Sequence, residues 1–345
     1  MITHPLSEPL KILDTLPGYR AHYRDIALWA PAIRAVCTET GLTCRQIRQG
    51  AAGTFPVFVL DDRWVIKFFG PLFDGSSAFE VETAVSDSLA AQPDLPLVRV
   101  LHLGSVPGAE RGWRYLVYPF VHGRSFGEDR GRIAADNQAA LARRLGEILR
   151  RFHHLPAPAQ PAHVFTTDGS AYQAKLRGWF SARLHAADQH TYAGLGLPDH
   201  LAAEAGGYLA RYASPSGQSR LHLIHADLTA DHVLGEFGGG QWRINGIIDM
   251  GDCMTGDLFY ELVALYLDLF NAQKPLLAAF LEGYGAALHT RSDFPPRCLC
   301  AALQHQFNVF TPLFEAYPAL AHSPTLDHLA QSVWGLSSSL SPLAG

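Results

Sequence analysis

The stretch from residue 221 to 261 constrains the fold more than any other part of the chain. It opens with the apolar run 221–224, which predicts a short buried strand, and continues into the polar sequence His225-Ala226-Asp227-Leu228. Two further strand-like runs, 232–237 and 242–248, flank three consecutive glycines. Glycines between two such runs are typical of a β-hairpin.

Two carboxylates lie at the ends of this hairpin. Asp227 comes just before the first strand and Asp249 ends the second, so we expect them to converge on one site. Phosphoryl transfer needs such a pair, because one carboxylate takes the proton of the attacking hydroxyl and another holds Mg²⁺ against the nucleotide phosphates. Asp227 would be the base and Asp249 the metal ligand. The alternative is two unrelated loop acids beside strands.

Composition narrows the class of protein. The chain has 345 residues, enough for two lobes, with 48% hydrophobic and 17% charged residues. A net charge of −5 gives no reason to expect nucleic acid or membrane as a partner. The five cysteines form no Cys-x-x-Cys pair, the N-terminus shows no signal pattern, and no apolar window is long enough to span a membrane. We therefore expect a reduced, cytoplasmic protein, of an oligomeric state that the sequence leaves open.

The segment before Lys67 contains a candidate phosphate loop. Residues 1–42 show helical spacing and stop at Gly41. Two strand-like segments then flank the small residues Gly50 to Gly53, which would let backbone N–H groups approach phosphates. On this interpretation Thr54 and Phe55 contact the nucleotide. An ordinary hairpin turn is the alternative.

Lys67 lies inside an apolar strand, where its charge must find a partner or reach water. The functional interpretation is a lysine that grips phosphates and pairs with a helix glutamate. Glu82 shares a helical face with the apolar residues after it and is the better partner. Glu80 is the reserve, because the run from Ser77 to Glu80 has the pattern of a capping box. The alternative is a strand lysine that reaches solvent, with both acids solvated.

The apolar strand 115–121 predicts a hinge whose backbone would bind a purine. Pro119 has no N–H, so Tyr118, Phe120 or Val121 must donate. Ile248 is expected to line the same nucleotide site. Later helices are expected at 136–154, 170–187, 198–213 and 258–270, with a linker at 214–219 and further helices after 275. Glu261 and Asp268 interrupt the apolar helix 258–270, so each needs a basic partner or a cleft.

The order of these landmarks resembles the aminoglycoside phosphotransferase and choline kinase-like family. The resemblance is carried by His-x-Asp-Leu at 225–228, Ile-Asp at 248–249, Gly-Asp at 256–257, the Val-Ile-Lys run around Lys67 and Leu-Gly-x-x-Leu at 145–149. It is strongest toward the hygromycin B 7″-O-phosphotransferases. The family implies an α+β, two-lobed, protein kinase-like fold. A small N-lobe would span residues 1–118, and a mostly helical C-lobe would span 119–345.

The resemblance also implies roles for residues. Asp227 would be the catalytic base, Asp249 a metal ligand, and Lys67 with Glu82 the phosphate-gripping pair, while Asp257 would brace the catalytic loop. The cofactor would be Mg²⁺, with Mn²⁺ as a variant, and ATP or GTP would donate the phosphate. The acceptor would be a small polar, cationic hydroxyl compound, with hygromycin B or a related aminocyclitol antibiotic as the best guess.

Two departures from the family pattern concern the site. His232 stands where the family has an asparagine that ligates the second metal. It could hold Mn²⁺ more willingly than Mg²⁺, hydrogen-bond the loop instead, or leave Asp249 alone with the metal. Asp252 follows the metal strand and either binds substrate amines or faces water. Glu261 and Asp268 are further candidates for substrate binding.

The sequence also has alternative functional interpretations. A choline, homoserine or sugar kinase of the same fold, or an inactive nucleotide-binding module, are the alternatives. The histidines of the central stretch suggest a metallohydrolase, but His222 and His225 would point to opposite faces of a strand. A protein kinase is disfavoured because the HRD, DFG and APE sequences are absent.

Overall fold

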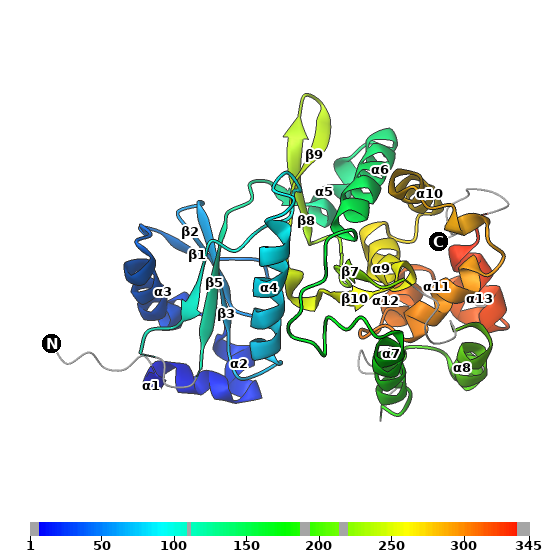
Figure 1. Cartoon of the computed structure of the whole chain (residues 1–345), viewed down its shortest axis with the longest axis horizontal. Coiled ribbons are helices and arrows are strands. Elements are labelled where there is room, and N and C mark those ends of the chain that lie inside the picture. Colours follow the sequence, from blue (N-terminus) through cyan, green and yellow to red (C-terminus); the bar gives the residue numbers. More distant parts are fainter. Residues whose placement is uncertain (1–6, 109–111, 187–193, 214–219, 337–345) are drawn as a thin grey trace. The chain divides into compact units, whose positions relative to one another are not determined.

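The computed structural model describes residues 7–108, 112–186, 194–213 and 220–336, which form two compact units (Figure 1). The first unit comprises Met1–Pro93, Leu97–His122 and Ile248–Asp252. The second comprises Asp94–Pro96, Gly123–Ile247 and Cys253–Gly345. The segment that carries Asp249 therefore packs with the first unit, although it follows the hairpin of the second.

The first unit is built on a five-stranded antiparallel sheet with the strand order β1-β2-β3-β5-β4. Its elements are α1 (Ser7–Leu10), η1 (Lys11–Asp14), α2 (Leu16–His22), α3 (Ile26–Thr40), β1 (Ile47–Gln49), β2 (Val57–Leu60), β3 (Trp64–Phe69), α4 (Gly75–Leu89), β4 (His102–Ser105), β5 (Arg114–Pro119) and η3 (Met250–Asp252).

Alternation along the strands gives this sheet two different faces. Successive side chains of a strand point to opposite faces. Phe68 of β3 packs with Trp29 of α3, whereas Phe69 packs with Phe79 of α4. The two helices accordingly cover opposite faces of the sheet, as Figure 1 shows. Lys67 alternates with Phe68, so it lies on the α4 face.

The predicted N-terminal helix is divided in the structure. Thr15 caps α2, whose first turn contains a proline, and α3 begins after the cap Asp25. The predicted stop is confirmed, because Gly41 closes α3 with a φ of 72°. The capping box expected at Ser77 is wrong. Helix α4 already begins at Gly75, after a residue in the left-handed region, and has no side-chain cap.

The second unit is mostly helical, with a three-stranded sheet β6-β8-β9 and the pair β7-β10. The α+β prediction is therefore confirmed. The elements are β6 (Arg124–Ser125), α5 (Phe126–Asp129), η2 (Arg130–Arg132), α6 (Ala135–Phe152), α7 (Gly169–Leu184), α8 (Asp199–Tyr212), β7 (His222–Ile224), β8 (Val233–Gly238), β9 (Gln241–Ile247), β10 (Met254–Gly256), α9 (Leu258–Ala264), the π-helix η4 (Leu265–Leu269), α10 (Lys274–Tyr284), η5 (Leu288–Thr290), α11 (Phe294–Leu303), α12 (Phe310–Ala316), η6 (Pro318–His322) and α13 (Leu326–Trp334).

The predicted hairpin is confirmed as β8 and β9. Gly239 and Gly240 connect the strands with φ angles of 62° and 83°, which is the backbone of a type I′ turn. The expected linker 214–219 lies outside the described residues. No helix in the described part of the chain is long and apolar enough to cross a membrane.

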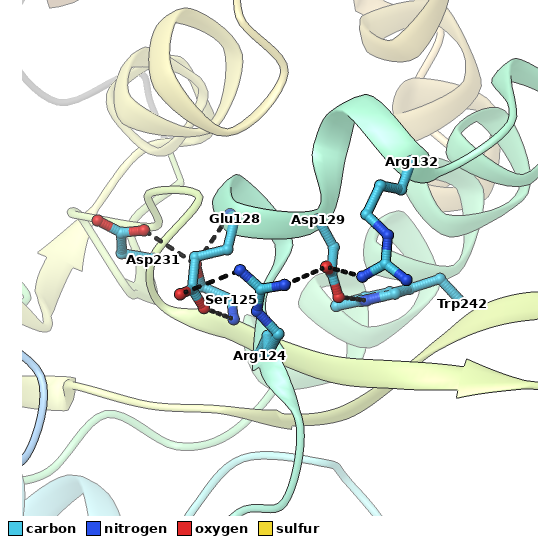
Figure 2. Close-up of polar contacts among 7 residues, drawn as sticks. All are labelled: Arg124, Ser125, Glu128, Asp129, Arg132, Asp231 and Trp242. Carbon is cyan, nitrogen blue, oxygen red and sulfur yellow. Dashed lines mark hydrogen bonds and ion pairs between the residues drawn. The ribbon is translucent and has the colours of Figure 1, made fainter.

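Trp242 fixes the hairpin to the helices beside it. The Asn137 side chain pairs with both backbone groups of Trp242, at 2.8 Å to its N–H and 3.3 Å to its carbonyl. The Trp242 indole N–H donates to the buried Asp129 carboxylate at 3.1 Å. Arg124 and Arg132 donate to the other oxygen of Asp129, as Figure 2 shows. Asp129 is thus fully paired, which a buried carboxylate requires.

Helices α6 and α10 cross closely because each has a glycine at the crossing. A Cβ on Gly146 would lie 2.2 Å from the Phe280 carbonyl oxygen, and one on Gly283 would lie 2.0 Å from that of Arg143. Both distances are sterically forbidden. The Leu-Gly-x-x-Leu sequence is therefore a packing requirement of the second unit.

Candidate functional site

Lys67 is the centre of a charged cluster in the first unit. Its ammonium donates to Glu82 Oε1 at 2.5 Å and to Asp249 Oδ1 at 2.7 Å. Glu82 follows Phe79 by one helical turn, so α4 presents both to the same face of the sheet. The predicted partner of Lys67 is the one that the structure shows. Glu80 instead lies 3.4 Å from Arg114.

Burial and charge act in opposite directions on this cluster. Only 7% of Lys67 and 3% of Glu82 is exposed. Burial opposes the charge of Lys67, but the carboxylates of Asp249 and Glu82 outweigh it and raise its pKa. Burial also raises the pKa of Glu82, against the effect of Lys67. The Tyr118 hydroxyl donates to the second Glu82 oxygen. Two carboxylates thus share one ammonium, which leaves excess negative charge for a further cation.

Asp249 combines an accessible carboxylate with an unusual backbone. Its φ of 67° lies in the left-handed region, which non-glycine residues adopt rarely and which concentrates at functional sites. About two fifths of its side chain (39%) is exposed. It is a hard oxygen donor, as Mg²⁺ prefers. Ile248 and Asp252 lie in the same segment of the first unit.

The other residues predicted to bind nucleotide belong to the same unit as this cluster. The Phe55 ring is 5.4 Å from Lys67 Nζ. The Thr54 carbonyl accepts a bond from the Tyr19 hydroxyl at 2.7 Å. In the expected hinge, the Phe120 N–H donates to the Arg63 carbonyl at 2.9 Å, so Tyr118 and Val121 are the remaining candidate donors to a purine.

The loop after β7 carries Asp227 in the second unit, and its near end is held at Ala226. This residue has a φ of 67°. Its N–H donates to Glu261 Oε2 at 3.0 Å, and its carbonyl lies 3.2 Å from His305 Nε2. Because a carbonyl only accepts, Nε2 carries the proton of His305, and Nδ1 accepts from the Phe307 N–H. Burial lowers the pKa of His305 to about 4 and raises that of Glu261 to about 7.

The far end of the loop is held at Ala230. Its N–H donates to Asp268 Oδ1 at 2.7 Å, and its carbonyl accepts from the Gly127 N–H at 3.1 Å. The next residue, Asp231, accepts a bond from the Ser125 hydroxyl at the start of α5 (Figure 2). Glu261 and Asp268 were expected to face substrate. In the structure both bind backbone N–H groups of the loop that carries Asp227.

Asp257 was expected to brace this loop, but its side chain has a different contact. Its side chain accepts the Tyr260 N–H at 3.0 Å and thereby caps α9. The residue that braces the loop directly is Glu261, one turn further along the helix. Sequence reasoning named Glu261 but could not give its partner, because the contact joins residues far apart in the chain.

His232 contacts the loop through its ring. Its Nδ1 lies 2.6 Å from the Asp227 carbonyl, so Nδ1 carries the proton and Nε2 does not. Metal-binding histidines usually have this arrangement, with the second ring N–H donated to a carbonyl. In the described part of the chain, no group of three or more His, Cys, Asp or Glu side chains could hold a metal by itself. Asp227 lies in the second unit and Asp249 in the first, and their convergence stays a prediction.

Residues 43–296 match the Phosphotransferase enzyme family, and the chain belongs to that family. The GDP complex of aminoglycoside 2′-phosphotransferase-IIIa is similar with a TM-score of 0.62 and 17% identity, over 85% of this chain and 91% of that one. Aminoglycoside phosphotransferase APH(4)-Ia is similar with a TM-score of 0.53 and 18% identity, over 90% of this chain and 100% of that one. These likenesses confirm the predicted kinase-like fold.

One relative carries the name of a different class of enzyme. The lysine-specific demethylase JMJ21 of Arabidopsis thaliana is 22% identical over 280 residues, which are 65% of this chain and 29% of that protein. The chain therefore spans less than a third of that relative's length. This match adds no activity to the phosphotransferase assignment.

Proposed function

We propose that this protein transfers the γ-phosphate of ATP or GTP to a hydroxyl of an aminoglycoside-type small molecule. The observation that carries the proposal is the contact of Lys67 Nζ with the carboxylates of both Glu82 and Asp249. A lysine on the third strand, a helix glutamate and a metal-binding aspartate are the nucleotide-gripping parts of kinase-type enzymes. All three residues were predicted from the sequence, and Glu82 and Asp249 both contact the Lys67 Nζ atom.

The residues of the chain divide the reaction between them. Lys67 binds the phosphates, and Asp249 with His232 would hold Mg²⁺ or Mn²⁺, which neutralises phosphate charge when bound. Asp227 accepts the proton of the substrate hydroxyl and orients its oxygen toward the γ-phosphorus. The new oxygen–phosphorus bond forms in line as the bond to the β-phosphate oxygen breaks, and the nucleoside diphosphate leaves. Positioning supplies most of the rate.

The acceptor is proposed from similarity and not from a built pocket. A similar structure, with 18% identity and a TM-score of 0.61, is named as a complex with GDP and kanamycin, and another as a ternary complex with ADP and hygromycin B. Those names describe those proteins. Hygromycin B or a related aminocyclitol is our first candidate here. Choline, homoserine or a sugar are the candidates if the antibiotic fails.

The test is nucleotide consumption by the purified protein with a panel of acceptors. The panel holds hygromycin B, kanamycin, choline, homoserine and simple sugars, each with ATP and GTP and with Mg²⁺ and Mn²⁺. Asp227→Ala is expected to lower turnover by about 10²- to 10⁴-fold, the range for a positioned general base, with little change in nucleotide affinity. Asp87→Ala, an exposed acid of α4, is the matched control and should leave turnover unchanged.

The outcomes separate the candidate functions. Turnover of hygromycin B that Asp227→Ala abolishes supports the whole proposal. Turnover of another hydroxyl compound keeps the chemistry and replaces the acceptor. Tight nucleotide binding without transfer to any acceptor favours a binding module. Undiminished turnover in Asp227→Ala would reject Asp227 as the base.

A further inference from the structure

The candidate phosphate turn between β1 and β2 is attached to the N-terminal helices by two of its carbonyl groups. The Tyr19 hydroxyl donates to the Thr54 carbonyl at 2.7 Å, and the Arg24 guanidinium donates to the Gly50 carbonyl at 3.1 Å. Tyr19 belongs to α2, and Arg24 follows this helix before α3 begins. The residues from Ala51 to Thr54 are themselves exposed.

These two hydrogen bonds also determine the direction in which two backbone N–H groups of the turn point. In a trans peptide the C=O and the N–H point in opposite directions. Because α2 and Arg24 hold the carbonyls of Gly50 and Thr54, the N–H groups of Ala51 and Phe55 point away from them. Neither N–H donates to an acceptor among the residues that the structure describes. Two donors of one exposed turn, fixed in this way, make a backbone site for an anion.

The turn also lies beside the cation of the proposed nucleotide site. The Phe55 ring is 5.4 Å from Lys67 Nζ. It also packs against Phe69, which lies two residues after Lys67 on β3. An anion bound by the Phe55 N–H is therefore within the same part of the first unit as the Lys67 ammonium. Nucleotide phosphates are the anions that such a combination suits.

We propose that Tyr19 and Arg24 are positioning residues of the nucleotide site, which orient the N–H groups of Ala51 and Phe55 toward the phosphates. Helix α2 is then part of nucleotide binding. This inference rests on the proposed function, because it assigns the turn a nucleoside di- or triphosphate. It adds two residues that neither the sequence pattern nor the Lys67 cluster indicated.

The structure supplies a matched pair of substitutions. Tyr19 stacks on Tyr23, with ring centroids 5.3 Å apart, and meets the edge of Phe73 at 5.2 Å. Tyr19→Phe removes the hydroxyl and keeps this packing. Tyr23→Phe removes a hydroxyl from the stacked neighbour that contacts no acceptor among the described residues. Arg24→Met removes the second bond, and Arg24→Lys restores a donor.

The first measurement is the affinity for fluorescent ADP and GDP analogues of the wild type and the four variants, with Mg²⁺. Loss of one hydrogen bond should weaken binding by about 3- to 10-fold in Tyr19→Phe and in Arg24→Met. Tyr23→Phe should bind as the wild type does, and Arg24→Lys should recover part of the loss. In turnover assays the KM for nucleotide should rise by the same factor, with kcat within about twofold.

Amide hydrogen exchange of the ligand-free protein reports on the turn itself. Exchange of peptides that cover residues 50–56 should be faster in Tyr19→Phe than in Tyr23→Phe, while the melting temperatures of the two stay similar. If the wild type binds nucleotide and Tyr19→Phe and Arg24→Met bind it equally well, the inference is overturned and the proposed function stands. If the wild type binds no nucleotide, both are overturned.

Discussion

Lys67 Nζ and Asp249 Oδ1 lie 2.7 Å apart, although 182 residues separate them in the chain. This contact holds the segment after β9 against the sheet of the first unit. It also gives the Lys67 ammonium a second carboxylate in addition to Glu82. A buried cation between two carboxylates makes the whole cluster depend on the lysine, because without it the buried Glu82 carboxylate has no cation to pair with and faces the negative charge of Asp249.

Lys67→Met tests this dependence. Nucleotide turnover should fall by at least about 10²-fold, because the phosphates lose their cation. The free energy of unfolding should fall by about 3 kcal/mol at pH 8, the cost of breaking a buried pair. The loss should be smaller at pH 5, because burial raises the pKa of Glu82 and its protonation relieves the repulsion between the two acids.

Denaturant unfolding at both pH values measures the effect on stability. Lys274→Met, at the start of α10, is the control and should change neither turnover nor the pH dependence of stability. A Lys67→Met protein with wild-type stability at pH 8 would show that the cluster does not need its cation.

The Lys67–Glu82 pair could be predicted from sequence because both residues follow local rules. A charged residue in an apolar strand needs a partner, and helical periodicity places Glu82 on the face that meets the sheet. The hairpin was predictable for a similar reason, since glycines at 239 and 240 fit the backbone that its turn requires.

Contacts between distant segments were not predictable in this way. The spacing of Glu261 and Asp268 on an apolar helix showed that each acid needs a partner, but not that both partners are backbone N–H groups of the loop that carries Asp227. The π-helical turn at Leu265–Leu269 has no local signal either, and it contains Asp268, the residue that binds the Ala230 N–H. The contacts of Tyr19 and Arg24 could not be predicted because their acceptors are backbone carbonyls, which exist at every residue.

Glu261 makes the stability of the protein depend on pH. Burial raises its pKa from 4.5 to about 7, so the folded protein binds more protons than the unfolded chain between these values. The stabilisation that comes from the protonated form is complete below pH 4.5 and is lost as the pH rises through about 7. Glu261→Gln keeps an oxygen acceptor for the Ala226 N–H and cannot ionise. It should therefore exceed the wild type in stability by about 1–3 kcal/mol at pH 8, with no difference at pH 4.5.

Chemical denaturation at intervals from pH 4.5 to 8 measures this difference. Subtracting the two curves cancels other titrating groups, including His305 and His153, whose lowered pKa values act at acidic pH. A constant difference between the two proteins across this range would rule out ionisation of Glu261 as the cause.

Asp268 should affect catalysis without affecting nucleotide binding. Its carboxylate holds the Ala230 N–H at 2.7 Å, at the end of the loop that carries Asp227. Asp268→Ala should lower kcat by about 10- to 100-fold, because a loosened loop misplaces Asp227, the proposed base. The affinity for ADP should stay unchanged, and hydrogen exchange in residues 226–231 should become faster.

Two further variants separate positioning from general destabilisation. Asp268→Asn keeps an oxygen acceptor and should recover part of kcat. Glu315→Ala, an exposed acid of α12, should behave as the wild type does. If Asp268→Ala retains full kcat while exchange in the loop increases, the bond to Ala230 has no role in catalysis.

His232 should set the metal preference. Its Nδ1 is committed to the Asp227 carbonyl at 2.6 Å, so Nε2 is the atom that could bind a metal. Imidazole nitrogen suits Mn²⁺ better than Mg²⁺, which prefers oxygen. His232→Asn replaces the nitrogen by an amide oxygen. The ratio of turnover with Mn²⁺ to turnover with Mg²⁺ should fall, on the order of tenfold.

Mn²⁺ binding in the presence of ADP, followed by electron paramagnetic resonance, gives a readout that does not need turnover, and it should weaken in the same variant. His163→Asn, at an exposed histidine, is the control. An unchanged metal preference in His232→Asn would assign His232 to the loop alone and leave Asp249 as the metal ligand.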